Sequence, residues 1–120
     1  MALLSIAAQA GQEEWLTDFA KAKEAARERN VPILADFAGT DWCGWCIKLD
    51  SEVFSQDAFK AYAKTNLVLF LADYPRIKQL PAQSARQNET LAQQYNIEGF
   101  PTVLVLDANG KELARSGYRD

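Results

Sequence analysis

The chain of 120 residues contains no histidine and only two cysteines. The absence of histidine excludes Ser-His-Asp and Cys-His catalytic sites, histidine proton shuttles and every histidine-ligated metal site. Two cysteines are too few for a disulfide scaffold, or for a four-cysteine zinc or iron–sulfur site within one chain. A single chain is therefore predicted to bind no metal and no cofactor.

The sequence also lacks any basic run, and its net charge is −3, with 13 Lys and Arg against 16 Asp and Glu. This balance argues against a nucleic-acid-binding protein. Apolar residues make up 48% of the chain and charged residues 24%, which is the composition of an ordinary globular protein. The length fits one domain.

The longest apolar stretch near the start, residues 1–10, is far shorter than the roughly 20 residues that span a bilayer. It carries no Lys or Arg but ends in Ala-Gln-Ala, a small-x-small pattern favoured before signal cleavage. Two interpretations remain: the tail of an export signal, or an Ala-rich N-terminal extension. We predict an extension over residues 1–12 and one domain over 13–120, in a periplasmic or otherwise exported bacterial protein, with a cytoplasmic location as the alternative.

Hydrophobic periodicity predicts alternating helices and strands. The expected elements are a helix over 13–30, a buried strand over 33–37, a helix from the cysteines to 49, a helix to about 64 with Ser55 as its N-cap, a strand over 67–71, a long loop over 74–88, a short helix over 89–95, a strand over 102–106, and an antiparallel strand over 111–118. Right-handed crossovers make the first two strands parallel neighbours in a mixed sheet with helices on its faces, an α/β fold.

Cys43 and Cys46 are spaced i, i+3 where a strand gives way to a helix. In a first helical turn this spacing brings both sulfurs to one face, close enough to bond. Free N–H groups and the helix dipole favour the thiolate at Cys43, which is the attacking species in disulfide exchange. The pair therefore predicts an exposed nucleophile with an adjacent resolving thiol.

Three other interpretations of this cysteine pair stand beside redox chemistry. The pair can be half of a zinc site completed by a second chain, a structural disulfide, or two inert buried thiols. A four-residue loop constrains the unfolded chain little, so a structural disulfide would stabilise it only weakly. A Cys-x-x-Cys after a strand in a βαβ setting favours redox chemistry.

Three segments together resemble the thioredoxin superfamily, and more narrowly the bacterial thioredoxin-like thiol-disulfide interchange or disulfide-isomerase-like proteins with a Trp-Cys-x-Trp-Cys motif. They are the strand 33–37, the run Trp-Cys-Gly-Trp-Cys at 42–46, and Gly-Phe-Pro-Thr at 99–102 with Asn-Gly-Lys at 109–111. The resemblance covers about residues 13–118. It implies a thioredoxin fold, a mixed central sheet flanked by helices, here without the usual C-terminal helix. One face of the strand 103–106 would then be short of cover, unless a partner or a second copy fills it.

The resemblance also implies roles for individual residues. Cys43 would be the nucleophile and Cys46 the resolving thiol. Pro101 would be the cis proline that faces them, with Phe100 offering backbone pairing to an extended substrate. Asp36 resembles the buried carboxylate that passes protons to the resolving cysteine, and burial in an apolar strand predicts a raised pKa. One extra residue separates Asp36 from Cys43 compared with ordinary thioredoxins, and a solvated strand-end carboxylate is the alternative.

The two residues between the cysteines, Gly44 and Trp45, depart from the Gly-Pro of ordinary thioredoxins. Loss of the proline frees a backbone N–H that can stabilise a thiolate and make the pair more oxidising. Trp42 and Trp45 are predicted to form an apolar platform for an unfolded substrate around Gly44. Packing against the sheet edge is the alternative for both tryptophans.

The sequence thus predicts a thiol-disulfide oxidoreductase whose partners are protein dithiol or disulfide substrates and a redox partner protein. We expect a monomer, or a dimer if an apolar face is left uncovered. Two alternatives of other classes are a redox-inactive binding module for unfolded chains, and a dimeric metal or iron–sulfur carrier with one Cys-x-x-Cys per chain. Reductase, oxidase and isomerase share this chemistry, and the sequence does not distinguish them.

Overall fold

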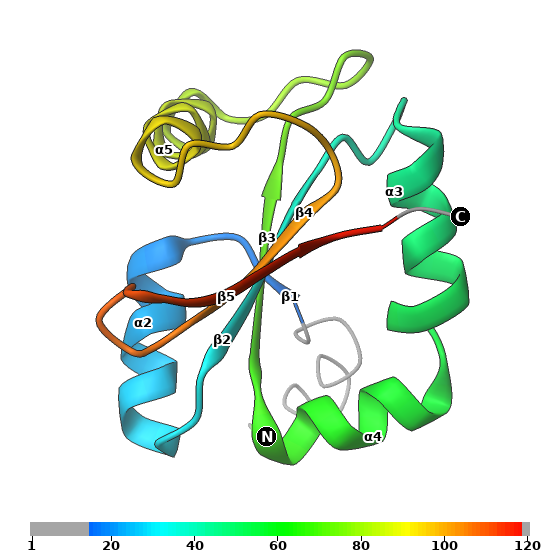
Figure 1. Cartoon of the computed structure of the whole chain (residues 1–120). Coiled ribbons are helices and arrows are strands. Elements are labelled where there is room, and N and C mark those ends of the chain that lie inside the picture. The colour runs from blue at the N-terminus through cyan, green and yellow to red at the C-terminus, as the bar shows by residue number, and fades with distance from the viewer. Residues whose placement is uncertain (1–14, 119–120) are drawn as a thin grey trace, which may run out of the picture.

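The computed structural model describes residues 15–118, which form a five-stranded sheet with helices on both faces (Figure 1). The elements in chain order are β1 (Trp15–Leu16), α2 (Phe19–Arg29), β2 (Ile33–Ala38), α3 (Gly44–Leu49), a π-helical turn η1 (Asp50–Phe54), α4 (Asp57–Asn66), β3 (Val68–Asp73), α5 (Ala82–Gln94), β4 (Thr102–Leu106) and β5 (Glu112–Gly117). None of the helices in this part of the chain is long and apolar enough to cross a membrane. The predicted N-terminal extension lies outside it.

The sheet is mixed, with the strand order β1-β3-β2-β4-β5. β3 runs parallel to β1 and β2, β4 runs antiparallel to β2, and β5 runs antiparallel to β4. Ile33 pairs with Val68 at one end of the parallel pair, and Ala38 pairs with Asp73 at the other. The predicted α/β architecture, with its two long strands as parallel neighbours, is confirmed.

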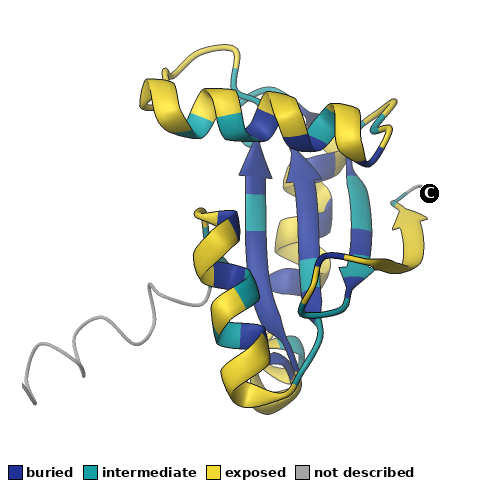
Figure 2. Ribbon diagram, turned by 90° about the vertical axis from the view of Figure 1, so that its left-hand side faces the viewer, coloured by how far each residue is buried: buried dark blue, intermediate teal, exposed yellow. Residues whose placement is uncertain are grey.

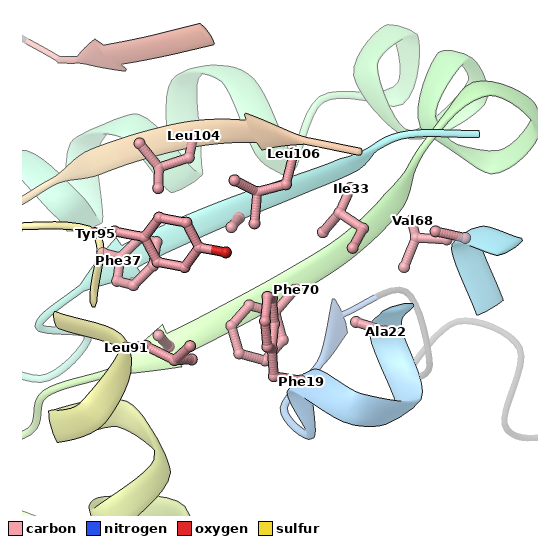
Figure 3. Close-up of a cluster of buried hydrophobic side chains, with 13 residues drawn as sticks. Phe19, Ala22, Ile33, Phe37, Val68, Phe70, Leu91, Tyr95, Leu104 and Leu106 are labelled. Carbon is pink, nitrogen blue, oxygen red and sulfur yellow. The ribbon is translucent and has the colours of Figure 1, made fainter. Parts of the chain in front are cut away.

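The main core lies between the sheet and the layer formed by α2 and α5 (Figure 3). Successive residues of a strand point to opposite faces, so every second residue of β2 and β3 enters this core. The Phe19 ring of α2 packs on Phe70 of β3, with ring centroids 5.1 Å apart. The other buried members are Ala22, Ala26, Ile33, Ala35, Phe37, Val68, Ala72, Leu91, Tyr95, Leu104 and Leu106.

The alternate residues of β2 and β3 point to the opposite face of the sheet, where α3 and α4 pack. Leu69 belongs to a cluster with Ala63 of α4, against which Leu34 packs, while Ala38 packs with the two cysteines at the start of α3. The same alternation along β2 places Asp36 on the face toward α3. Strand periodicity alone thus brings a carboxylate toward the cysteine pair.

Helix α2 begins later than the predicted helix over 13–30. The side chain of Asp18 accepts the N–H of Lys21 and caps the helix, and Asn30 in the left-handed region ends it. Trp15 and Leu16 form the short edge strand β1 instead, paired with β3. The prediction that Trp15 belongs to the apolar face of this helix was wrong. The Trp15 ring packs on Phe54, with ring centroids 5.0 Å apart, rather than on the α2 side of the sheet.

Two further boundaries differ from the prediction. Ser55 does not cap a helix: its hydroxyl donates to Asp50 at 3.1 Å, because η1 continues α3 to Phe54, and α4 starts at Asp57 after Gln56. The loop predicted over 74–88 ends at Pro81, where α5 begins with Ala82. Proline has a φ suited to a helix start, and α5 presents polar residues outward, so its composition resembled that of a loop.

Strands β4 and β5 have one thinly covered face. Leu104 and Leu106 are fully buried, whereas Val103 and Val105, which alternate with them along the strand, are only half-buried. All six residues of β5 are exposed (Figure 2). The expected shortage of cover on one face of the strand 103–106 is therefore seen in these valines.

Candidate functional site

Cys43 and Cys46 form a disulfide at the N-terminus of α3, with Cα atoms 5.2 Å apart. A tight turn leads into the helix. In this turn the N–H of Cys43 donates to the carbonyl of Gly39 at 2.9 Å. Cys43 is the N-cap residue, and its Sγ accepts the backbone N–H of Cys46 at 3.2 Å. The turn and the helix start hold the Cys43 sulfur where the N–H of Cys46 is directed at it.

The disulfide is more enclosed than the sequence predicted. We expected an exposed nucleophile, but Cys43 is 6% exposed and Cys46 is 5% exposed. The reason is tertiary: Trp42 and Phe100 pack against the cluster that the cysteines form with Ala38. In this oxidised state, aromatic rings therefore shield the pair.

The two tryptophans have different surroundings. Trp42 is half-buried, its Nε1–H donates to the carbonyl of Tyr74 at 2.8 Å, and its ring meets Phe100 edge-on. Trp45 is 40% exposed and contacts Tyr118 edge-on, with Lys48 Nζ 5.2 Å from its ring centroid. For Trp42 the packing interpretation is closer to the structure, whereas Trp45 presents an apolar surface to solvent.

Gly39 makes room for the Trp42 indole. A Cβ placed on Gly39 would overlap Nε1 and the neighbouring carbons of that ring, whereas a Cβ on Gly44 would meet no atom within 4 Å. We expect Gly39→Ala to displace Trp42 and to lower the free energy of unfolding by about 1–3 kcal/mol, as overpacking does. Gly44→Ala, the matched control, should not lower the free energy of unfolding in urea, because Gly44 begins α3 and alanine is favoured over glycine in a helix. Equal stabilities of the two variants would contradict this role for Gly39.

The peptide bond between Phe100 and Pro101 is cis, the isomer that the resemblance to thioredoxins implies. Phe100 also packs on Tyr74, with ring centroids 4.9 Å apart. Phe100, Pro101 and Trp45 line a cavity of about 820 Å³ that is closed on its other side by the end of β5. Trp42 and Phe100 line a second groove of about 530 Å³. The predicted substrate-binding residues are thus divided between two depressions that share Phe100, and Gly44 lines neither.

Asp36 is buried, with 7% of its surface exposed, and its Oδ1 has no hydrogen-bond partner. It lines a cavity of about 340 Å³ together with Cys46 and Asp50. Burial raises the pKa of Asp36 to about 7, and the negative charges of Asp50 and Asp73 add to this rise. The predicted raised pKa is confirmed, and the alternative of a solvated strand-end carboxylate is wrong.

Sequence reasoning missed Asp50 and Asp73. Asp50 follows Cys46 by four residues, one helical turn, a spacing that places both on one helix face and that could have been read from the sequence. Asp73 is buried at the end of β3, where it accepts hydrogen bonds from the N–H and the hydroxyl of Thr40 at 3.0 and 2.8 Å. Its side chain therefore supports the turn that leads to Cys43.

The arrangement suits reversible formation and breakage of a disulfide. One sulfur lies at a helix start, its partner lines a cavity with a carboxylate whose pKa is about 7, and the rings of Trp42, Trp45 and Phe100 around the pair border two depressions. Within residues 15–118, no group of three or more Cys, Asp or Glu side chains is placed to hold a metal ion.

Comparison with known proteins gives matches over most of the chain. A family model described as a thioredoxin-like domain matches residues 19–120. The disulfide bond reductase DsbH of Chlamydia pneumoniae is 36% identical over 100 residues, which cover 83% of this chain and 60% of that protein. The thioredoxin-related protein DsbJ of the same bacterium is 26% identical over 103 residues, which cover 86% of this chain and 30% of DsbJ.

Among solved structures, a DsbH oxidoreductase superposes with a TM-score of 0.82 at 35% identity, covering 88% of this chain and 72% of the other. A thioredoxin from Thermus thermophilus superposes with a TM-score of 0.64 at 17% identity, covering 86% of this chain and 73% of the other, and shows the fold alone. The chain spans 60% of the length of the curated DsbH.

Proposed function

Because the chain belongs to the thioredoxin-like family, we propose that it is a thiol-disulfide oxidoreductase that exchanges disulfides with protein substrates. The observation that carries the proposal is the Cys43–Cys46 disulfide at the start of α3, beside a buried carboxylate and the cis-proline loop. The names of the relatives, a disulfide bond reductase and thiol:disulfide interchange proteins, support it.

In the proposed reaction, the reduced protein transfers two electrons to a substrate disulfide. The Cys43 thiolate attacks one substrate sulfur, so that a bond forms between Cys43 and the substrate while the substrate disulfide breaks and releases a thiolate. The Cys46 thiol then loses its proton and attacks Cys43 Sγ. This second exchange forms the Cys43–Cys46 bond and releases the other substrate thiolate. A dithiol redox partner restores the reduced pair by the same exchange in reverse.

The surrounding groups have defined tasks in this scheme. The N–H of Cys46, 3.2 Å from Cys43 Sγ in the disulfide, is placed to stabilise the Cys43 thiolate after reduction. Asp36 shares its cavity with Cys46 and, with a pKa of about 7, is suited to accept the Cys46 proton near neutral pH. The N–H that reaches Cys43 belongs to Cys46 rather than to Trp45. Whether the Gly-Trp dipeptide makes the pair more oxidising therefore stays a prediction, to be checked by the reduction potential.

Redox titration tests the proposed function against its alternatives. In glutathione buffers of defined composition, a reversible two-electron titration of the cysteine pair supports the oxidoreductase. Unchanged substrate activity after Cys43→Ser would instead support a redox-inactive binding module, and metal found by elemental analysis would support a dimeric carrier. We also propose an exported protein, for which the Ala-Gln-Ala pattern is the support. N-terminal sequencing from the native host should give a mature start at Gly11.

Asp50 is expected to tune the pH dependence of the resolving step. Its charge faces Asp36 across the shared cavity and raises the pKa of Asp36 after the larger effect of burial. Asp50→Asn removes that charge, so the midpoint for deprotonation of Asp36 should move to lower pH, by less than about one unit because burial remains. The measurement is the rate of mixed-disulfide resolution as a function of pH.

Asp57→Asn is the matched control for this experiment, since Asp57 is an exposed carboxylate at the start of α4 and does not line the cavity. The control should keep the midpoint of the unmodified protein. A midpoint that stays the same in Asp50→Asn, or that moves equally in both variants, would show that Asp50 has no specific effect on Asp36.

A further inference from the structure

The loop 74–81, which joins β3 to α5, is fastened to the turn that precedes Cys43. The Asp41 carboxylate accepts three consecutive backbone N–H groups of this loop, from Arg76, Ile77 and Lys78, at 3.0, 3.0 and 2.8 Å. These backbone hydrogen bonds, that from Arg76 first, hold the pKa of Asp41 below its usual value. Figure 1 shows the two connections at the same end of the sheet. The turn 39–42 and the loop 74–81, more than 30 positions apart in the sequence, are thus joined into one rim.

This attachment places a cation on the ring next to the nucleophile. The Arg76 guanidinium lies 3.5 Å from the centroid of the Trp42 ring. The ring is itself held by its hydrogen bond to Tyr74. An arginine stacked by its face keeps the N–H groups of its edge available for a planar anion such as a carboxylate.

The two cations of the rim differ in their partners. Lys78 forms an ion pair with the buried Asp73 at 3.1 Å, so its charge is largely compensated. For Arg76, no carboxylate of residues 15–118 is within ion-pairing distance. Because the chain carries a net charge of −3, a general attraction of anions is not expected. The positive charge at Arg76 is a local feature of this rim.

Arg76 borders the groove of about 530 Å³ that Trp42 and Phe100 line. Its aromatic walls suit an extended peptide segment, and two of them, Trp42 and Phe100, also pack against the cluster that contains the cysteines. A segment lying there would place its side chains beside the Arg76 guanidinium while its cysteine approaches Cys43.

We propose that this groove takes the part of a substrate protein next to its reactive cysteine, and that Arg76 selects substrates with an Asp or Glu at that place. The inference rests on the proposed function and names the class of substrate that the site prefers. Asp41 acts as a positioning residue, because it holds the loop that presents Arg76.

The test uses three synthetic peptide disulfides that are identical except for the two residues next to the cysteine, which are Glu, Gln or Lys. Pre-reduced protein is mixed with excess peptide, and the second-order rate of the single turnover is measured. We expect the Glu peptide to react about three- to fivefold faster than the Lys peptide, because an exposed ion pair stabilises a complex by a free energy of this order. Added salt should reduce that ratio, because it screens the pair.

Arg76→Gln should bring the Glu-to-Lys ratio close to one, because the cation that distinguishes the two peptides is removed. Asp41→Asn should reduce the ratio as well; because loss of its negative charge alone would raise the ratio, a decrease shows that Asp41 acts by positioning Arg76. Arg86→Gln is the matched control, because Arg86 is an exposed arginine of α5 that does not line the groove, and it should keep the ratio of the unmodified protein.

The outcomes separate the two proposals. Equal rates with all three peptides would overturn the selection by Arg76 while leaving the oxidoreductase in place. Loss of the ratio in Arg86→Gln as well as in Arg76→Gln would reduce the effect to overall charge and overturn the assignment to the groove. No reaction with any peptide would overturn the proposed function itself.

Discussion

Replacing Cys43 by serine is expected to abolish disulfide exchange and to lower the rate by more than about 10³-fold, since loss of a nucleophile typically costs at least this much. A hydroxyl at this position is not ionised at neutral pH, so the N–H of Cys46, 3.2 Å from the sulfur, has no thiolate to stabilise. The measurement is reduction of a protein disulfide by protein that has first been reduced with dithiothreitol.

Cys46→Ser is the matched variant for this prediction. It keeps the attacking sulfur but removes the resolving one, so the covalent complex between Cys43 and the substrate should accumulate and be visible on a non-reducing gel. The order of alkylation checks the same assignment, because Cys43 should react faster than an ordinary free thiol at neutral pH. Turnover that survives in Cys43→Ser, or a covalent complex formed through Cys46, would reverse the roles.

Replacing Asp36 by asparagine is expected to stabilise the folded protein more at pH 8 than at pH 5. Burial is the main cause that raises the pKa of Asp36 from 3.8 to about 7. A carboxyl whose pKa is raised by folding contributes stability that is fully present below about pH 4 and is lost as the pH rises through about 7. The whole rise in pKa corresponds to a loss of about 4 kcal/mol in the free energy of unfolding. About 2 kcal/mol or more of this loss occurs between pH 5 and pH 8.

Urea unfolding of the oxidised protein at both pH values measures this effect. The stability difference between Asp36→Asn and the unmodified protein should grow by about 2 kcal/mol between pH 5 and pH 8. Glu89→Gln, which removes an exposed carboxylate on α5, should show no such change. The same Asp36 variant should slow resolution of the mixed disulfide, because Cys46 loses its neighbouring proton acceptor. An equal stability difference at both pH values would mean that Asp36 ionises normally.

Asp36 combines a cost in stability with a use in the proposed reaction. Its Oδ1 has no hydrogen-bond partner, and both neighbouring charges that act on it, those of Asp50 and Asp73, are negative. A buried polar group without a partner is unfavourable for folding. Perturbed carboxyls of this kind concentrate at functional sites, which agrees with a carboxylate kept beside Cys46 for proton transfer.

Several elements of the site could be predicted because their signals are local. Cys43 and Cys46 are three residues apart between a strand and a helix, and Asp36 is the one carboxylate in an apolar strand. Strand alternation then directs Asp36 toward the helix that carries the cysteines. These are properties of neighbouring residues, and the sequence alone was sufficient for them.

Other features depended on contacts between distant parts of the chain. Trp15 has the spacing of a helical stripe, but its packing on Phe54 and the pairing of β1 with β3 decide its conformation. The enclosure of the disulfide results from Phe100, more than 50 residues further along the chain. No periodicity indicates that Asp41 binds the loop at Arg76, or that the Arg76 guanidinium rests on Trp42.

Helix and strand periods and helix capping act over a few residues, so the order of amino acids is enough to place the parallel strands, the cysteine pair at a helix start and the buried acid. The surroundings of that pair come from residues that are distant in the chain: Asp50 and Asp36 line one cavity, rings cover the sulfurs, and the Arg76 guanidinium lies on the Trp42 ring. Burial and charge–charge interactions depend on distance in space, and folding alone brings these groups together.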